Sequence, residues 1–378
     1  MYAFYAFGIT DLQDLIPLLL ASLKRGKQCW FCIFDNLLSK KQFYYYNKEE
    51  IINFLEEICE NNNLSKPNIG FFHCEDKKKF TSVYSEFNPE VVFIQNILHK
   101  NISWYPTAKK SKVVHVAWPI DGARHATSTP YNIWLNIVRK EADLKHYGVC
   151  GLKNIPPWLS SRIKNKEKLF SMRTKYFGNL RLEHLNYVPT LKNFPEKSIL
   201  RGKNICFIVE AHLRNDLEFR KQTADFVDKI INFLHENNYY IIWKTREKGY
   251  PKGKWCSPLD IATKKPDFVI NKDLNYPSSL VYTPLIADIC LTINTTTAIY
   301  DLQEINNNSF LLHPEKLSVR ENEIYQRRYK GNVKYLQLKN ESSWQTLKSL
   351  LCKKNIVNFT SDVFPSTGLM EKIEKVLN

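Results

Sequence analysis

The chain has 378 residues, of which 44% are hydrophobic and 13% aromatic, and this excludes a largely disordered protein. It is also too long for one ordinary hydrophobic core, so two domains are expected. Its 54 basic and 38 acidic residues give a formal net charge of +16, which favours anionic partners such as phosphorylated substrates, acidic lipids or nucleic acid.

The cysteines and the N-terminus indicate the compartment. The nine cysteines are scattered, and Cys29 and Cys32 form the only CxxC pair, so a zinc site lacks its second pair. We therefore expect no metal and reduced core thiols. The first residues lack the basic start of a signal peptide, and the apolar run Leu15–Leu23 is too short to cross a bilayer. These features predict a cytoplasmic protein, with at most a peripheral contact at the inner face of the membrane.

The first half alternates strand-like and helix-like segments. The expected strands are Tyr2–Phe7, Cys29–Phe34, Phe71–His73, Val91–Gln95 and Val113–Ala117, and the expected helices are Asp11–Lys24, Lys48–Glu60 and Asp76–Glu86. Such alternation predicts parallel strands joined by helical crossovers. Beyond Trp118 the pattern fades, and Asp143–Cys150 and Ile155–Trp158 are expected to be irregular.

The second half repeats the alternation after a connector at Tyr187–Lys203. Its expected strands are Asn204–Val209, Tyr239–Trp243, Phe268–Ile270, Ile289–Ile293 and Ser309–Leu312. Its expected helices are Asp216–Asn237, Pro277–Ala287 and one that starts at the turn beginning with Asn294. The predicted fold is α/β, with two Rossmann-like domains that face each other across a cleft. We place the boundary near Phe194, which gives domains 1–194 and 195–378. A C-terminal helix around Leu369–Leu377 is expected to pack back onto the first domain.

The segment Ala287–Glu304 predicts a phosphate site. A buried strand is followed by the hydroxyl-rich turn Asn294, Thr295, Thr296 and Thr297, and then by a helix. The first turn of a helix presents unpaired N–H groups and a positive dipole end, which suit a phosphate. On that helix, Asp301 and Glu304 lie three residues apart and so share a face, where they could accept hydrogen bonds from sugar or polyol hydroxyls.

Three other polar loops follow predicted strands. The loop after Val113–Ala117 carries Asp121 and His125, either of which could take a proton from a hydroxyl group. We expect Asp121 to be the base, with His125 as its competitor because of an unperturbed pKa near 6.5. The other two loops offer candidates for binding the donor and its phosphate. Glu210, His212 and Arg214 come at the end of the strand Asn204–Val209, and Lys244 and Arg246 follow the strand Tyr239–Trp243.

The order of these motifs resembles the GT-B enzymes related to CDP-glycerol glycerophosphotransferases of teichoic acid synthesis and their capsule-building relatives. The resemblance runs from Val113 to Leu312 and rests on Tyr176–Leu185, Asn204–Asp216, Tyr239–Arg246 and Ala287–Leu302. The chain departs from the family where Pro119 follows Trp118, at Thr245-Arg246, and at the Asn294–Thr297 turn. These departures weaken polyol-phosphate chemistry and favour the sugar transfer of relatives that use CMP-activated, Kdo-type donors.

The resemblance therefore implies an inverting, metal-independent glycosyltransferase without a cofactor. It would move a sugar from a nucleotide-activated donor, CMP- or CDP-linked, to a bacterial surface glycan or lipid-linked acceptor. Polyol-phosphate transfer and a sugar-nucleotide 2-epimerase on the same scaffold are the alternatives. A basic nucleic-acid-binding protein is a third, but the charge is scattered and no binding motif is recognisable, so no nucleic-acid partner is expected.

Overall fold

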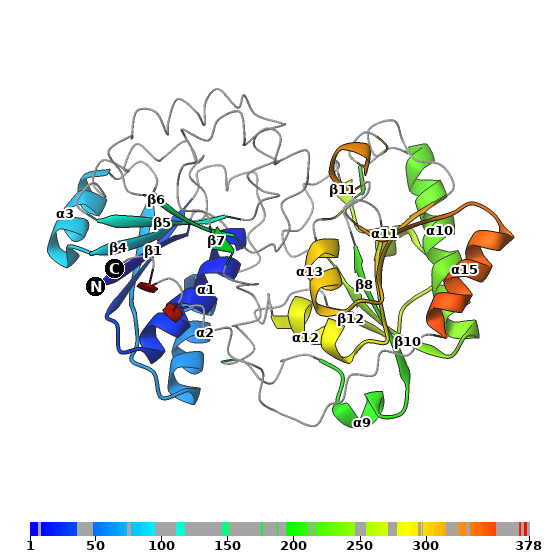
Figure 1. Cartoon of the computed structure of the whole chain (residues 1–378), viewed down its shortest axis with the longest axis horizontal. Coiled ribbons are helices and arrows are strands. Elements are labelled where there is room, and N and C mark those ends of the chain that lie inside the picture. The colour runs from blue at the N-terminus through cyan, green and yellow to red at the C-terminus, as the bar shows by residue number, and fades with distance from the viewer. Residues whose placement is uncertain are drawn as a thin grey trace. The chain divides into compact units, whose positions relative to one another are not determined.

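The chain divides into two units, each built on its own parallel sheet (Figure 1). Unit 1 comprises Met1–Lys40, Tyr46–Pro189 and Val363–Asn378, and unit 2 comprises Lys41–Tyr45 and Thr190–Asp362. The computed structural model describes residues 1–6, 9–35, 48–73, 77–94, 111–117, 146–150, 175–176, 187, 194–210, 213–214, 217–245, 255–270, 278–293, 296, 298–314, 322, 325–329, 333–352, 370–371 and 374–375.

The sheet of unit 1 has the strand order β3-β2-β1-β4-β5-β6-β7, and each neighbouring pair is parallel. Its strands are β1 (Tyr2–Ala6), β2 (Cys29–Asp35), β3 (Asn68–His73), β4 (Val91–Ile94), β5 (Lys112–Ala117), β6 (His146–Cys150) and β7 (Lys175–Tyr176). The helices are α1 (Ile9–Lys24), α2 (Lys48–Asn61) and α3 (Lys77–Phe87). Every residue of β1 is buried, as expected for a central strand covered on both faces.

The core of unit 1 is rich in aromatic side chains. Trp30 of β2 stacks on Phe80 of α3 with ring centroids 5.6 Å apart, and Tyr5 meets the same Phe80 edge-on at 5.4 Å. Phe34 and Phe72 complete the cluster. These offset and edge-to-face contacts are the favoured aromatic geometries, so they fix α3 against the sheet.

The C-terminal segment Val363–Asn378 belongs to unit 1 although unit 2 precedes it in the chain. Met370 lies against Ser22 of α1, with Ser22 Oγ 3.7 Å from its sulfur. Arg25 forms ion pairs with Glu371 and Glu374 at 3.2 and 2.7 Å. A buried hydroxyl–sulfur contact and two ion pairs therefore join the described end of the chain to α1.

The sheet of unit 2 has the order β12-β10-β8-β13-β14-β15 and is also parallel throughout. Its strands are β8 (Asn204–Glu210), β10 (Tyr239–Lys244), β12 (Phe268–Ile270), β13 (Ile289–Ile293), β14 (Ser309–Pro314) and β15 (Tyr335–Leu338), while β9 (Leu213–Arg214) and β11 (Trp255–Cys256) form a separate antiparallel pair. The helical segments are α9 (Lys197–Leu200), α10 (Leu217–Glu236), α11 (Pro258–Ile261), α12 (Ser278–Ile286), α13 (Ala298–Ile305), the π-helical turn η3 (Tyr325–Tyr329) and α15 (Glu341–Leu351).

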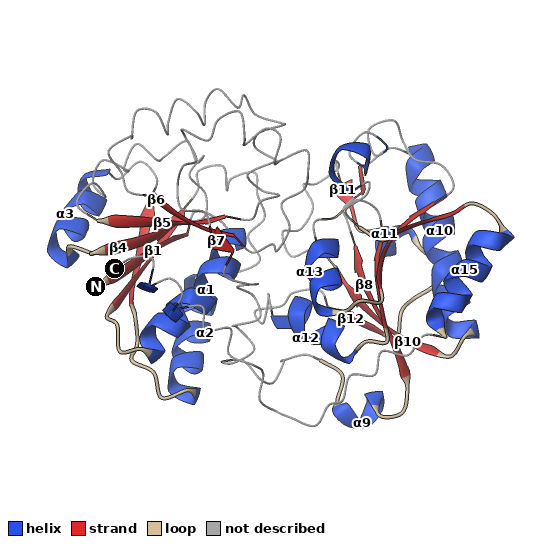
Figure 2. Cartoon of the chain, in the orientation of Figure 1, coloured by secondary structure: helices blue, strands red, loops and turns tan. Residues whose placement is uncertain are grey.

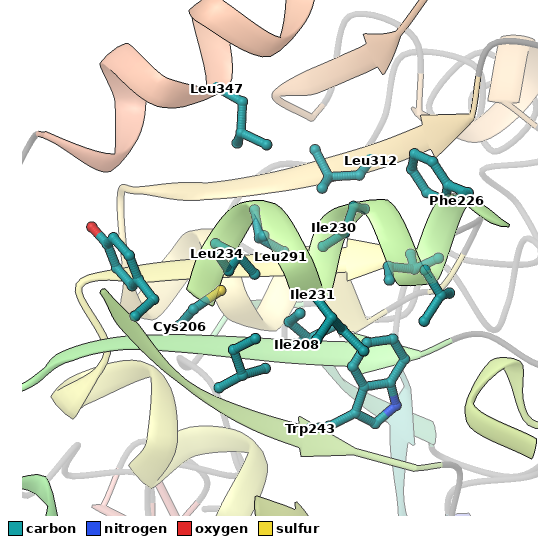
Figure 3. Packing of buried hydrophobic residues seen from close by; sticks show 14 of the residues in the cluster. Cys206, Ile208, Phe226, Ile230, Ile231, Leu234, Trp243, Leu291, Leu312 and Leu347 are labelled. Carbon is teal, nitrogen blue, oxygen red and sulfur yellow. The ribbon is translucent and has the colours of Figure 1, made fainter. Parts of the chain in front are cut away.

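Helices cover both faces of this sheet (Figure 2). On one face, Ile230 and Leu234 of α10 and Leu347 of α15 pack on strand residues such as Ile208 and Leu291 (Figure 3). On the other face, the core includes Leu280 of α12 and Leu302 of α13, together with Phe207, Val209, Ile242 and Cys290 of the strands. Alternate residues of each strand therefore point to the α10 face and to the α12 face.

The fold-class prediction of two Rossmann-like domains with parallel sheets is confirmed. When the parallel strands of either unit are numbered in chain order, the first six run 3-2-1-4-5-6, which is the Rossmann order. Two details were wrong. The stretch at Asp143–Cys150 includes strand β6, and the second sheet does not end at Leu312 but continues through β15.

The structure also bears on membrane-spanning helices and on the state of the cysteines. Among the described residues, no helix combines the length and apolar character needed to cross a bilayer. The six cysteines whose side chains are described are all free thiols, five of them buried.

Candidate active site at the carboxyl edge of unit 2

The strand order of unit 2 reverses between β8 and β13, which are direct neighbours. The chain leaves β8 toward α10 on one face and leaves β13 toward α13 on the other. Ligands of open α/β sheets bind outside the carboxyl ends of the strands at such a reversal point. At this edge, Glu210 ends β8 directly beside Ile293, which ends β13.

Four of the predicted site residues reach this edge with described side chains. Glu210 is the last residue of β8 and Lys244 is the last residue of β10. Thr296 lies in the turn after β13, and Asp301 is in the first turn of α13. The structure thus brings together residues from three separate polar segments, because parallel strands end at the same edge.

Glu210 points to the α10 face and is almost fully buried, with an exposed fraction of 3%. Its Oε2 accepts hydrogen bonds from Trp243 Nε1 at 2.9 Å and from Ser257 Oγ at 2.6 Å. Ser257 in turn caps α11, since its Oγ also accepts from the backbone N–H of Leu259. The carboxylate therefore anchors the first turn of α11 to the end of the sheet.

Lys244 points to the opposite face of the sheet, toward α12. Its register partner in β8 is Val209, which belongs to the core beneath α12, whereas Glu210 follows one residue later and faces the other way. The Lys244 side chain is buried, with 2% exposed. A buried ammonium group requires compensation by anionic or polar groups, and it favours negative charge nearby.

The N-terminus of α13 follows the end of β13 (Figure 1). Thr296 Oγ1 accepts a long hydrogen bond of 3.4 Å from the backbone N–H of Ala298, the first residue of the helix. Asp301 is buried in the first turn, where the helix dipole stabilises a carboxylate. This geometry suits an anion held by backbone N–H groups, with an acidic side chain close by for hydroxyl groups.

The remaining predicted site residues have no described side-chain geometry. Asp121, His125, His212, Arg246, Asn294, Thr295 and Thr297 lie outside the described residues. Arg214 is placed only by its backbone, in β9 opposite Trp255 of β11, and Glu304 only by its position in α13. Their roles stay predictions.

The sequence analysis missed several polar residues at or near this edge. Thr292, Ser279 and His313 are all buried, and none of their polar side-chain atoms has a hydrogen-bond partner in the described structure. Burial lowers the pKa of His313 from 6.5 to about 4. The imidazole lies beside the stacked rings of Tyr335 and Tyr325, at centroid distances of 5.5 and 6.4 Å. Ser279, Thr292 and His313 are each a polar residue within a largely apolar strand or helix, and the periodicity of the sequence does not distinguish such a residue from its neighbours.

A metal centre is not indicated by the described part of the chain. There, no group of three or more His, Cys, Asp or Glu side chains is placed to hold a metal ion.

Comparison with known proteins identifies the fold through solved structures. No protein-family model matches the chain, and no curated protein sequence does so either. A UDP-GlcNAc 2-epimerase from Methanocaldococcus jannaschii is similar with a TM-score of 0.60 and 11% identity, over 100% of this chain and 99% of that chain. The UDP-GlcNAc 2-epimerase from Neisseria meningitidis, bound to UDP-GlcNAc, has a TM-score of 0.59 and 11% identity over the same shares. The S. aureus protein MnaA, in a structure with UDP, has a TM-score of 0.60 and 12% identity, over 100% of this chain and 95% of that one.

The chain has the fold of these proteins. At such low identity the similarity shows the two-domain architecture, which is of the GT-B type, and not the reaction. It corrects the main functional hypothesis, however. Structures of UDP-GlcNAc 2-epimerases match over the whole chain, so the main prediction of a glycosyltransferase was wrong and the epimerase alternative agrees better with them. The specific resemblance to CDP-glycerol transferases is likewise not supported.

Proposed function

We propose that this protein is a sugar-nucleotide 2-epimerase that acts on a UDP-linked N-acetylhexosamine. The proposal rests on one observation: the whole chain, with both of its units, is similar to structures of UDP-GlcNAc 2-epimerases over nearly their full length. One of these structures is bound to UDP-GlcNAc and the MnaA structure contains UDP. A nucleotide-sugar ligand also agrees with the surplus of basic residues in this chain.

The carboxyl edge of unit 2 supports binding of the nucleotide. The N-terminus of α13 and the buried ammonium of Lys244 supply positive potential, which suits a diphosphate. The Asp301 carboxylate suits ribose or sugar hydroxyls, because a carboxylate accepts hydrogen bonds from them.

We propose that inversion at C2 begins when a base removes the C2 hydrogen as a proton while the C1–O bond to the diphosphate breaks, so that the electron pair forms a C1=C2 double bond and UDP leaves. A proton then returns to C2 from the opposite side of the ring as UDP adds back at C1. At least one side chain must therefore act as a base and one as an acid. Asp121 and His125 are the proposed proton carriers, since they lie close together in the sequence and differ in their intrinsic pKa. Arg246 and His212 are proposed to contact the nucleotide diphosphate.

The test is an incubation of the full-length protein with UDP-GlcNAc in D₂O, followed by proton NMR. We expect formation of UDP-ManNAc and loss of the C2 proton signal from both sugars, because solvent deuterium returns to C2. Asp121→Asn and His125→Ala should reduce exchange while UDP binding persists. Retention of the C2 proton together with an unchanged substrate would contradict the proposal, and so would tight binding of CMP or CDP without binding of UDP.

A further inference from the structure

We propose that Ser279, Thr292 and Lys244 form an inner subsite for a phosphate oxygen beneath the carboxyl edge of unit 2. These three residues are called the inner polar row below. The inference rests on the proposed function, since it takes the diphosphate of the nucleotide as the ligand. It extends the site from the turn before α13 into the layer between the sheet and α12.

The register of the sheet aligns two members of the row. Lys244 of β10 and Thr292 of β13 are both register partners of Val209 in the intervening strand β8. Residues in register on neighbouring parallel strands point to the same face, and Val209 packs in the core beneath α12. Lys244 and Thr292 therefore lie at one level of the sheet, two strands apart, with both side chains under α12.

Helix α12 brings the third member to this level. It follows β12 and leads into β13, so it starts at the carboxyl edge and runs back to the amino edge, where Ala287 joins the core. Ser279 is in its first turn and is 1% exposed. Thr283 lies one turn deeper on the same side of the helix and is also buried. Of the two buried hydroxyls Ser279 and Thr283, Ser279 therefore lies closer to the carboxyl edge, where Lys244 and Thr292 are found.

The hydrogen-bonding state of the two hydroxyl groups in the row points to a ligand. The hydroxyl groups of Ser279 and Thr292 are buried and have no hydrogen-bond partner in the described structure. Buried hydroxyls are nearly always bonded to protein, water or a ligand. Both hydroxyls can donate, Lys244 adds positive charge, and the positive dipole end of α12 lies at the same level. A phosphate oxygen accepts from all of these groups, whereas an apolar ligand would satisfy none of them.

The experiment measures UDP affinity by calorimetry for the full-length wild type and four variants. Ser279→Ala and Thr292→Val remove one hydroxyl each, whereas Thr292→Ser keeps the hydroxyl and removes only the methyl group. Thr283→Val is the matched control, because the hydroxyl of Thr283 is equally buried and unpartnered but lies deeper in the layer. We expect Ser279→Ala and Thr292→Val each to weaken UDP binding about tenfold, or about 1.4 kcal/mol. Thr292→Ser and Thr283→Val should keep the wild-type affinity. Uridine, which lacks phosphate, should bind equally to all five proteins.

The outcomes separate this inference from the proposed function. If the wild type binds UDP and the Ser279→Ala and Thr292→Val proteins bind it equally well, the row is an internal polar layer filled by water, and the inference is overturned while the proposed function stands. If the wild type binds inorganic pyrophosphate but not UDP, the proposed function fails, and the same variants measured with pyrophosphate decide the subsite. If the wild type binds neither, both are overturned. Melting temperatures of all variants show whether a loss of affinity reflects a loss of fold.

Discussion

Trp243 Nε1 donates a hydrogen bond of 2.9 Å to Glu210 Oε2, so the indole of β10 is tied to the last residue of β8. Both groups are buried on the α10 face of the sheet. The carboxylate receives a second hydrogen bond from Ser257, the N-cap of α11. The predicted contact of Glu210 with the donor substrate stays a prediction, and the Oε2 atom of this carboxylate is engaged inside unit 2. This contact fixes the ends of two adjacent strands at the candidate site.

The first prediction concerns this contact. Trp243→Phe removes the N–H donor and keeps an aromatic ring in the core. We expect a loss of about 1–3 kcal/mol in the free energy of unfolding, because a buried acceptor loses a partner. Urea denaturation followed by circular dichroism measures it. In a double-mutant cycle with Glu210→Leu, the two losses should add up to more than the loss in the double variant, and strict additivity would show that the hydrogen bond does not contribute.

The second prediction is a pH dependence of stability that arises from His313. Burial lowers its pKa from 6.5 to about 4, so between these values the unfolded chain binds a proton that the folded chain does not. Stability should therefore be unaffected by His313 above pH 6.5 and fall as the pH drops from 6.5 toward 4, by about 1.4 kcal/mol per pH unit.

Chemical denaturation between pH 4 and pH 8 tests this window. The control is His313→Leu, which removes the titrating group from the same apolar site and should flatten the profile over that range. The prediction is wrong if wild type and His313→Leu lose stability in parallel as the pH falls.

The third prediction concerns thiol reactivity. Burial raises the pKa of Cys29 to about 12 and that of Cys59 to about 11, whereas Cys352 is exposed. Since the thiolate is the reactive form, an alkylating reagent at pH 7.5 should label Cys352 quickly and Cys29, Cys32, Cys59, Cys206 and Cys290 only after unfolding. Peptide mass spectrometry reads out each site. Fast labelling of Cys29 in the native protein would contradict the packing of β2.

The fourth prediction concerns the turn before α13. Replacing Thr295 and Thr296 together with alanine should weaken nucleotide binding and leave the fold intact, because hydroxyl capping contributes only about 1 kcal/mol. Calorimetry with UDP and a melting curve measure the two effects. If the double variant binds UDP as tightly as the wild type, the prediction that this turn binds phosphate is wrong.

Local sequence patterns determined much of the fold. Apolar runs such as Tyr2–Ala6 and Ile289–Ile293 became the central buried strands β1 and β13, because a strand covered on both faces needs apolar residues at every position. The same alternation of strands and helices indicated two Rossmann-like halves. Strand β15 was missed because three of its four residues are only partly buried, and an edge strand of this kind leaves no clear period.

The candidate site was determined only in part by the sequence. Polar residues after strands indicated the correct edge, since parallel strands all end there. Which face each side chain takes, and what it contacts, was decided by the tertiary structure. Glu210 meets Trp243 and Ser257 on one face, while Lys244 shares the other face with Thr292. Periodicity reports the burial of a residue relative to its chain neighbours, whereas these partners lie 33 to 48 positions apart and meet only through strand register and helix packing.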